Sequence, residues 1–343
     1  MKFIHISILI LVLSLLPQKM YSQQRSEKVR IYTFKDGSIY EGDLKWHRPN
    51  GIGSAKYVNG DTYNGAYEKG VRSGEGVQQY ANGDKYTGFW LLDVREGEGE
   101  LRYADGDIYK GAWSADKRNG KGVYSWTDGS YYSGEWKDNL REGVGLMFWS
   151  DSTQYKGDWK AGKRDGQGVF TGKDYSYTGS WKADRKEGKG ECRFYTGDVY
   201  TGEFKNGLIT GNGIYKYVNG DKYEGTFENG LAQGKGTFTW SNGSIYNGEW
   251  VANKRDGKGK MQWANGDIYD GNWKDDKPHG EGSMILADGN RYSGEFSQGL
   301  VHGKGLVVEP DGTQYEGMFD SGKRVGVFIV KDSEGKEINR ITY

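Results

Sequence analysis

Basic side chains recur at one position of the sequence and are the residues best suited to binding an anion. Six of them each stand two positions before a glycine, at intervals of 22 or 23 residues: Arg72, Arg95, Arg118, Arg141, Arg164 and Lys186. If each interval supplies two strands, consecutive members lie about 10 Å apart along one edge of a sheet. This series, the basic ladder, could bind lipid phosphates, an anionic glycan or an acidic protein. Acidic residues follow several members directly, so the pattern is also typical of solvated turn charges.

The residues that an enzyme or a metal site would need are scarce. After the N-terminal segment the only histidines are His47, His279 and His302. His279 and His302 occupy equivalent positions of adjacent repeats, about 10 Å apart, whereas zinc bonds its ligands at about 2 Å. No nucleophile stands beside a base, and the Gly-x-Gly pairs lack the strand and helix context of a dinucleotide site. The sequence therefore predicts no catalytic site, no metal site and no cofactor, and it argues against a hydrolase.

Composition narrows the function further. Lysine plus arginine and aspartate plus glutamate both number 47, so no overall field would attract nucleic acid. Cys192 is the single cysteine, which excludes an intramolecular disulfide, and we expect it to pack rather than react. The 26 tyrosines and 12 tryptophans argue against disorder.

A repeat of 23 residues organises the elements that must position these side chains. A tyrosine heads each of thirteen copies, and only the sixth copy is one residue short: Tyr40, Tyr63, Tyr86, Tyr109, Tyr132, Tyr155, Tyr177, Tyr200, Tyr223, Tyr246, Tyr269, Tyr292 and Tyr315. A fixed period of this length is the signature of an array in which each unit packs on its neighbours.

Each unit has the pattern of a β-hairpin. In Tyr63-Asn64-Gly65-Ala66-Tyr67, alternation with period two places Tyr63, Gly65 and Tyr67 on one face. Asn-Gly or Asp-Gly pairs between most units supply the positive φ angles of tight turns. We therefore predict an all-β protein: an elongated single-layer antiparallel sheet of about thirteen stacked hairpins, roughly 120 Å long.

The ends and the middle of the array depart from the regular unit. Residues 29–37 match half a repeat and should cap the start, and residues 329–343 form a predicted C-terminal capping segment after an array over 31–328. We also expect a local irregularity between Ser150 and Ser176, where the fifth unit lacks its turn glycine and the sixth is short.

One aromatic position per repeat could serve a partner. It is occupied by Tyr80, Tyr103, Trp126, Trp149, Tyr217, Trp240 and Trp263. These rings could stack on sugars or hold an extended chain, although such rings are more often simply the packing of a thin sheet.

The unit resembles the MORN repeat family, in which Tyr-x-Gly-x-Trp/Phe precedes Gly-x-Gly. The match is seen in Tyr109-x-Gly111-x-Trp113 with Gly120-x-Gly122 and extends over about Ile31 to Phe328. The resemblance implies an elongated β array that acts as an interaction module, with phospholipid headgroups or proteins as partners. Some relatives carry a kinase or methyltransferase domain, and no such domain is present in this sequence.

The N-terminus resembles an export signal. Lys2 precedes an apolar run of about 14 residues that ends before Pro17. We expect a signal peptide over residues 1–22, a polar tail over 23–30 and a periplasmic, cell-surface or extracellular protein. An uncleaved membrane anchor is the alternative.

Two functions remain open from the sequence. The first is a non-enzymatic exported scaffold that binds another protein or itself. The second is a surface-binding module for anionic phospholipid headgroups or glycans, with the basic ladder as its candidate site.

Overall fold

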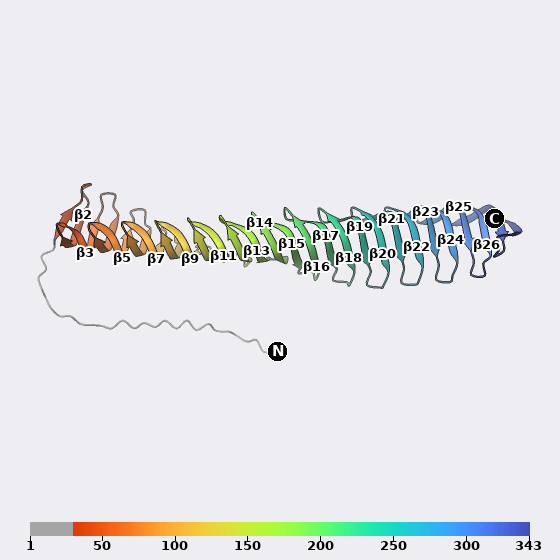
Figure 1. Cartoon of the computed structure of the whole chain (residues 1–343), viewed down its shortest axis with the longest axis horizontal. Coiled ribbons are helices and arrows are strands. Elements are labelled where there is room, and N and C mark those ends of the chain that lie inside the picture. The colour runs from red at the N-terminus through yellow and green to blue at the C-terminus, as the bar shows by residue number, and fades with distance from the viewer. Residues whose placement is uncertain (1–29) are drawn as a thin grey trace, which may run out of the picture.

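A single open sheet makes up the protein. The computed structural model describes residues 30–343, and the expected signal peptide, with most of the polar tail, lies outside the described residues. Within this range 28 strands pair in chain order, each antiparallel to the next, in one elongated stack (Figure 1). The predicted single-layer antiparallel sheet is confirmed. At about 4.8 Å per strand, 28 strands extend roughly 130 Å.

The strands alternate between about seven and about nine residues, two for each repeat. Their bounds are β1 (Ile31–Thr33), β2 (Ile39–Lys45), β3 (Arg48–Lys56), β4 (Thr62–Glu68), β5 (Val71–Gln79), β6 (Lys85–Leu91), β7 (Val94–Arg102), β8 (Ile108–Ser114), β9 (Lys117–Ser125), β10 (Tyr131–Lys137), β11 (Leu140–Phe148), β12 (Gln154–Lys160), β13 (Lys163–Thr171), β14 (Tyr175–Lys182), β15 (Arg185–Phe194), β16 (Val199–Lys205), β17 (Leu208–Lys216), β18 (Lys222–Glu228), β19 (Leu231–Thr239), β20 (Ile245–Val251), β21 (Lys254–Gln262), β22 (Ile268–Lys274), β23 (Lys277–Ile285), β24 (Arg291–Ser297), β25 (Leu300–Val308), β26 (Gln314–Asp320), β27 (Lys323–Lys331) and β28 (Glu337–Thr342).

The two turns of each repeat differ from the sequence-based expectation. The tight two-residue turn lies within the unit, as at Lys69 and Gly70, where both residues have positive φ (52° and 95°). The Asn-Gly pairs instead belong to three-residue loops: in one, Tyr80 N donates to Asp84 O and Gly83 N donates to Tyr80 O. Only the glycine of such a loop needs positive φ, which is the geometry of a type I turn followed by a glycine bulge.

A row of facing glycines crosses the sheet and makes room for the tyrosines. Gly65 pairs with Gly76, Gly76 with Gly88 and Gly88 with Gly99, and the series runs from Gly42 to Gly317. A Cβ on Gly99 would overlap the ring of Tyr86, which lies flat over this row. The Tyr86 hydroxyl donates to Phe89 O at 3.1 Å, and the ring is fully buried.

A bulge beside the glycine row bends every second strand. In the β4–β5 pair, Gly65 faces Gly76 but Tyr67 faces Arg72, so three residues of β5 oppose one residue of β4. Across the bend, Arg72 Nη1 donates to Gln78 Oε1 at 3.0 Å, so side chains from near both ends of β5 meet on one side of the sheet. We call this side of the sheet, which holds the repeat tyrosines, the aromatic face, and the opposite side the open face.

The rings of the aromatic face interlock from repeat to repeat. Tyr86 meets Trp90 of its own repeat edge-on at 5.1 Å and Trp113 of the next repeat at 5.5 Å. The same arrangement recurs along the sheet and supplies its buried core. Edge-to-face pairs of this kind add about 0.5–1.5 kcal/mol each beyond their buried area.

Candidate functional site

The basic ladder lies on the strands that follow the two-residue turns. Arg72 is the second residue of β5 and Arg95 the second residue of β7, so the ladder follows the edge of the sheet that carries these turns. The edge position was predicted from the sequence. The side chains, however, fold over the aromatic face and contact the next repeat.

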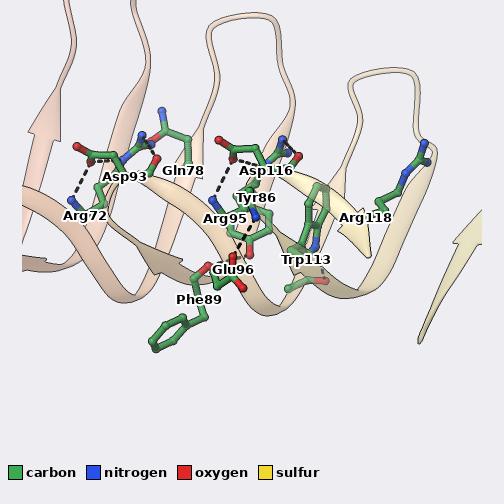
Figure 2. A network of polar contacts seen from close by, with 12 residues as sticks. Arg72, Gln78, Tyr86, Phe89, Asp93, Arg95, Glu96, Trp113, Asp116 and Arg118 are labelled. Atoms are coloured by element: carbon green, nitrogen blue, oxygen red, sulfur yellow. Dashed lines mark hydrogen bonds and ion pairs between the residues drawn. The ribbon is translucent and has the colours of Figure 1, made fainter. Parts of the chain in front are cut away.

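Each ladder arginine stacks on the tryptophan of the following repeat. The distances from the guanidinium carbon to the ring centroid are 3.9 Å for Arg72 on Trp90 and 4.2 Å for Arg95 on Trp113. In Figure 2 the arginines lie on the same side of the ribbon as Tyr86 and Trp113, whereas Phe89 points away to the open face. A desolvated cation over tryptophan contributes about 1–2 kcal/mol.

The same arginines hold the turn of the following repeat. Arg72 Nε donates to Asp93 Oδ1 at 3.1 Å, and its Nη2 donates to Asp93 O at 2.8 Å (Figure 2). Arg95 makes the equivalent contacts with Asp116. Asp93 has positive φ, and its carbonyl lies in the tight turn. Each guanidinium therefore ties one repeat to the next rather than facing solvent.

The acidic residues after the ladder also bind the following turn. Glu96 Oε2 accepts the Ala115 N–H at 2.9 Å, and Glu142 Oε2 accepts the Ala161 N–H at 2.8 Å. These carboxylates therefore act as turn acceptors. Where an acidic residue follows the arginine, the two side chains form one clamp on the next turn.

Comparison of the repeats shows what the clamp requires. Arginine stands over tryptophan in six repeats, including Arg255 over Trp273 at 4.3 Å. Lys186 instead lies over Phe204 at 5.3 Å, and the uncharged Ile209 precedes the repeat that contains Phe227. Each of these six arginines thus has a tryptophan as its partner, but Trp250 follows Ala232 and has no such tie. Binding of an external anion by the ladder stays a prediction.

Three ladder members differ because no carboxylate pairs with them among residues 30–343. Arg118 Nη2 donates to Asn139 O at 3.1 Å, and Arg141 Nη2 donates to Gly162 O at 2.8 Å, since asparagine and glycine replace the equivalent of Asp93 in these repeats. Lys186 Nζ lies 4.5 Å from the centroid of the Tyr175 ring. Burial lowers the pKa of Arg141 and of Lys186. These three residues are the members of the ladder that could meet an anion without losing a carboxylate partner.

The open face carries the side chains that alternate with the buried tyrosines. Large apolar residues are exposed on it in many repeats: Ile52, Phe89, Val123, Val144, Val169, Ile245, Ile285 and Met318. They are mixed with charged residues such as Lys189 and Glu203. Sequence reasoning missed this surface, although the alternation pattern and the aliphatic residues after Gly-x-Gly contained the signal.

Hollows on the open face run beside the glycine row. A hollow of about 830 Å³ spans β13 to β18, with the backbone of Gly190, Gly202 and Gly213 in its lining and with Lys189 and Glu203 beside them. Another, of about 740 Å³, is lined by residues from Glu75 to Glu98 and includes Phe89. Exposed glycine backbone flanked by apolar and charged side chains suits contact with an extended chain.

The short sixth repeat contains a third hollow, on the aromatic face. Gly172 occupies the position that is aromatic in the preceding repeats, and its loop closes tightly, with Gly172 N donating to Tyr175 O. A hollow of about 590 Å³ lies beside it, lined by Trp149, Phe170 and Tyr175 among others. The irregularity predicted for residues 150–176 is present, and Ser152, which replaces the turn glycine of the fifth unit, has a φ of 70°.

The remaining candidate positions are placed by the sheet. Cys192 is buried opposite Tyr177 in the pairing of β14 and β15. His302 Nδ1 lies 3.5 Å from Asp320 Oδ1. Across residues 30–343 no group of three His, Cys, Asp or Glu side chains is arranged to hold a metal ion. In that same part of the chain no helix is both long enough and apolar enough to cross a membrane.

Comparison with protein families gives one match over most of the chain. The MORN repeat model matches twelve consecutive segments, residues 40–62, 63–85, 86–108, 109–131, 132–154, 155–176, 177–199, 200–222, 223–245, 246–268, 269–291 and 292–314. The thirteenth unit, from Tyr315, lies beyond these segments. No curated protein matches the sequence.

Similar solved structures resemble the chain only loosely. The TCP domain of Drosophila melanogaster SAS-4, in complex with a proline-rich motif of Ana2, is 12% identical, with a TM-score of 0.27 over 58% of this chain and 90% of that one. The TCP10 domain of Danio rerio CPAP, in complex with a STIL peptide, is 11% identical, with a TM-score of 0.22 over 92% and 99%. A catalytically inactive virginiamycin B lyase from Staphylococcus aureus, with quinupristin, is 11% identical, with a TM-score of 0.13 over 84% and 91%. Scores this low carry no argument about function.

Proposed function

The chain belongs to the MORN repeat family, and from this premise we propose that it is a non-enzymatic, exported scaffold that binds a protein partner along its open face. MORN repeats generally act as interaction scaffolds. The proposal adds the surface through which this chain would act.

The observation that carries the proposal is the difference between the two faces. The aromatic face is covered by the chain's own tyrosines, tryptophans and arginines, whereas the open face exposes apolar side chains, with Val144 57% and Val169 41% accessible. Two hollows floored by glycine backbone lie on this face, one with Ile214 in its lining and the other with Val77 and Phe89. A row of separate apolar contacts rimmed by charges fits an extended protein segment.

The clamps weigh against the surface-binding alternative. Arg72, Arg95 and Arg164 each hold a turn aspartate, and their side chains are about one-fifth exposed. Binding a phosphate would have to break a contact that ties two repeats. Lys186 and Arg141 have no carboxylate partner among the described residues and therefore still favour anion binding, so the experiment below includes both.

A capture experiment with three forms of the mature chain (residues 23–343) tests the proposal. The first form is unchanged, the second carries Phe89→Ser, Val144→Ser and Val169→Ser on the open face, and the third carries Arg141→Gln and Lys186→Gln. Each form is mixed with the native envelope fraction and, separately, with vesicles that contain one-fifth anionic phospholipid. Circular dichroism first establishes that all three forms are folded.

We expect one protein to be captured by the first and third forms and lost from the second. Retention by the second form would remove the open face as the binding surface. If vesicles bind the first form but not the third, the anionic-lipid function replaces the scaffold. Rising ionic strength should weaken that lipid binding more than an apolar protein contact.

The exported location is part of the proposal and is supported by residues 1–22 of the sequence. Mass determination of the chain purified from its native source checks it. A mature chain that begins at Gln23 is expected, and an intact Met1 in the cytoplasmic fraction would contradict it.

A further inference from the structure

The third repeat exposes a large aromatic side chain on the open face, at a position that is small or polar in almost every other repeat. Phe89 stands there, whereas the other repeats have alanine or a polar residue, except the last, which has Met318. Leu91 and Leu92 follow Phe89 at the turn, and the three side chains are 41%, 45% and 71% exposed. The repeat itself does not need these apolar groups, because the other repeats form the same hairpin without them.

The position of Phe89 has a structural role where it is acidic. Asp158 accepts the Gln167 N–H at 2.7 Å, and Glu249 accepts the Lys258 N–H at 3.1 Å, each across the bulge of its own hairpin. A phenylalanine cannot accept the equivalent bond. The third repeat therefore has an exposed ring in place of a side chain that could stabilise its bulge.

Two glutamates flank the ring, and small residues lie beyond them. Glu75 faces Phe89 directly in the β5–β6 pair, and Glu98 of β7 lies on the other side of the ring, in the lining of the same hollow. Ala112 faces Glu98 in the β7–β8 pair, and Ala66 holds the equivalent position of the second repeat. Figure 2 shows the Phe89 ring projecting away from the ribbon. The ring and both carboxylates are therefore accessible to a partner.

The charge in the lining of this hollow is acidic only. Of the residues that line its volume of about 740 Å³, Glu75 and Glu98 are the charged members, and the others are glycine, valine, threonine and Phe89. Lys110 on the neighbouring strand faces Glu100 rather than Glu98. Within residues 30–343 neither Glu75 nor Glu98 accepts a side-chain hydrogen bond or forms an ion pair. A basic group with an apolar flank would complement this surface.

The aromatic face displays the contact that such a group would make. Arg95 lies 4.2 Å from the centroid of the Trp113 ring and is held there by Asp116. On the open face Phe89 also has carboxylates beside its ring, but no cation of the described chain lies over it. An arginine or lysine from outside can take this place, because a cation over an aromatic ring is attracted even at exposed sites.

We propose that Phe89 and Leu91 bind an extended basic segment of the partner protein, in which an arginine or lysine lies over Phe89 between Glu75 and Glu98. The two apolar residues stand on one face of β6, about 7 Å apart, which is the distance between alternate side chains of an extended segment. An aliphatic side chain two residues from the basic one would then pack on Leu91. The inference rests on the proposed scaffold function and adds the chemistry of the partner.

Fluorine NMR of the mature chain with 4-fluorophenylalanine at position 89 tests the site directly. The probes are the blocked peptides N-acetyl-Leu-Ser-Arg-Ser-Leu amide and its counterparts with glutamine or glutamate in place of arginine. A second chain carries the label at Phe148, which lies on the same face between the uncharged Tyr131 and Gln154.

A double substitution isolates the part played by the two carboxylates. Glu75→Gln with Glu98→Gln is made in the chain labelled at position 89. Glu203→Gln with Glu224→Gln is the matched control, because it changes the net charge equally at another hollow of the open face. Circular dichroism first establishes that every form is folded.

We expect the arginine peptide to shift the resonance at position 89 saturably, the glutamine peptide to bind roughly fivefold more weakly and the glutamate peptide not to bind. Glu75→Gln with Glu98→Gln should weaken the arginine peptide roughly fivefold, and the control pair should leave it unchanged. The proposal is overturned if the arginine peptide causes no saturable shift, if the resonance at position 148 responds equally, or if both double substitutions have the same effect. A shift that grows with chain concentration in the absence of peptide would make a second copy the occupant and overturn it too.

The capture experiment separates this inference from the proposed function. A protein that is captured by the unchanged chain and retained in full by Glu75→Gln with Glu98→Gln would overturn the basic-segment site and leave the scaffold intact. A chain that binds the arginine peptide at Phe89 but captures no protein would instead contradict the scaffold function.

Discussion

At the scale of single residues, the side chains that looked most like a binding site stabilise the array. Arg95 stacks on Trp113 and holds Asp116 of the next repeat. A guanidinium suits this position because its flat face packs on a ring while its edge donates to a carbonyl and a carboxylate. The contact joins two repeats, so its loss should weaken the interface between them.

Substitution of one clamp arginine measures this contribution. Arg95→Gln should lower the free energy of unfolding by about 1–2 kcal/mol, because both the stacking on Trp113 and the bond to the Asp116 carbonyl are lost. Arg102→Gln is the control, since Arg102 is 56% exposed and pairs with Glu100 on the open face. Its effect should stay within about 0.5 kcal/mol. Urea unfolding of each chain gives the values, and equal effects would contradict the clamp.

Buried tyrosines make stability depend on alkaline pH. Burial raises the pKa of Tyr200, Tyr223 and Tyr269 from 10.0 to about 12. The folded state therefore holds these protons more tightly than the unfolded state does. Their stabilisation is complete below pH 10 and is lost as the pH rises from 10 to about 12. Thermal unfolding followed across this range should show a steep fall in Tm, and a flat profile would mean that the hydroxyls are not buried.

At the scale of the element, the repeat depends on a glycine pair and the ring above it. Gly99 and Gly88 leave the space that the Tyr86 ring fills, and Tyr86 joins Trp90 to Trp113. Each hairpin is therefore stabilised chiefly by the contacts that its rings make with the hairpins on either side. An isolated hairpin is marginal in water.

A double-mutant cycle tests the fit of ring to glycine. Gly99→Ala should cost about 1–3 kcal/mol in the natural chain, because its methyl group overlaps the Tyr86 ring. With Tyr86→Ala already present, the same change should cost little. The cycle therefore predicts strong non-additivity in denaturant unfolding. Additive effects would show that the glycine is needed for its backbone rather than for space.

Much of this element could be predicted from the sequence, and some of it could not. The period placed the hairpins, the alternation placed Tyr63 and Gly65 on one face, and the one-residue deletion marked residues 150–176. The Asn-Gly pairs were expected to form tight turns and lie instead in three-residue loops, because Asn-Gly suits both a two-residue turn and a glycine bulge. That the ladder side chains fold over the next repeat could not be predicted, because the bulge beside Gly74 that folds Arg72 over its neighbour is a three-dimensional feature.

At the scale of the whole molecule, each repeat contacts only its neighbours along the chain. Deletion of one complete repeat, Tyr86 to Ile108, should therefore leave a folded array, because Arg72 would then meet Trp113 and Asp116. Small-angle scattering should show a molecule shorter by roughly 10 Å. Deletion of twelve residues, Tyr86 to Gly97, removes about one strand. It should prevent folding, because it reverses the direction of every later strand relative to the strands before the deletion. Equal tolerance of both deletions would contradict the stacked-hairpin order.

The surface proposed for partner binding is also a property of the whole array. Its apolar residues are single, lie at different positions of the repeat and are spread along the face because the repeats are stacked in one sheet. A partner that contacts several of them would span several repeats. One substitution should then weaken the contact modestly, and three together should abolish it.

The measurement that tests the central claim most directly is site-specific photo-crosslinking of the mature chain in its native envelope. A crosslinker is placed at Val144 or Val169 on the open face and, as a control, at Thr127, which is exposed in a three-residue loop at the edge of the sheet. We predict that both open-face positions crosslink to one and the same protein and that Thr127 does not. Crosslinks to lipid or glycan alone, or to that protein from Thr127 alone, would contradict the account.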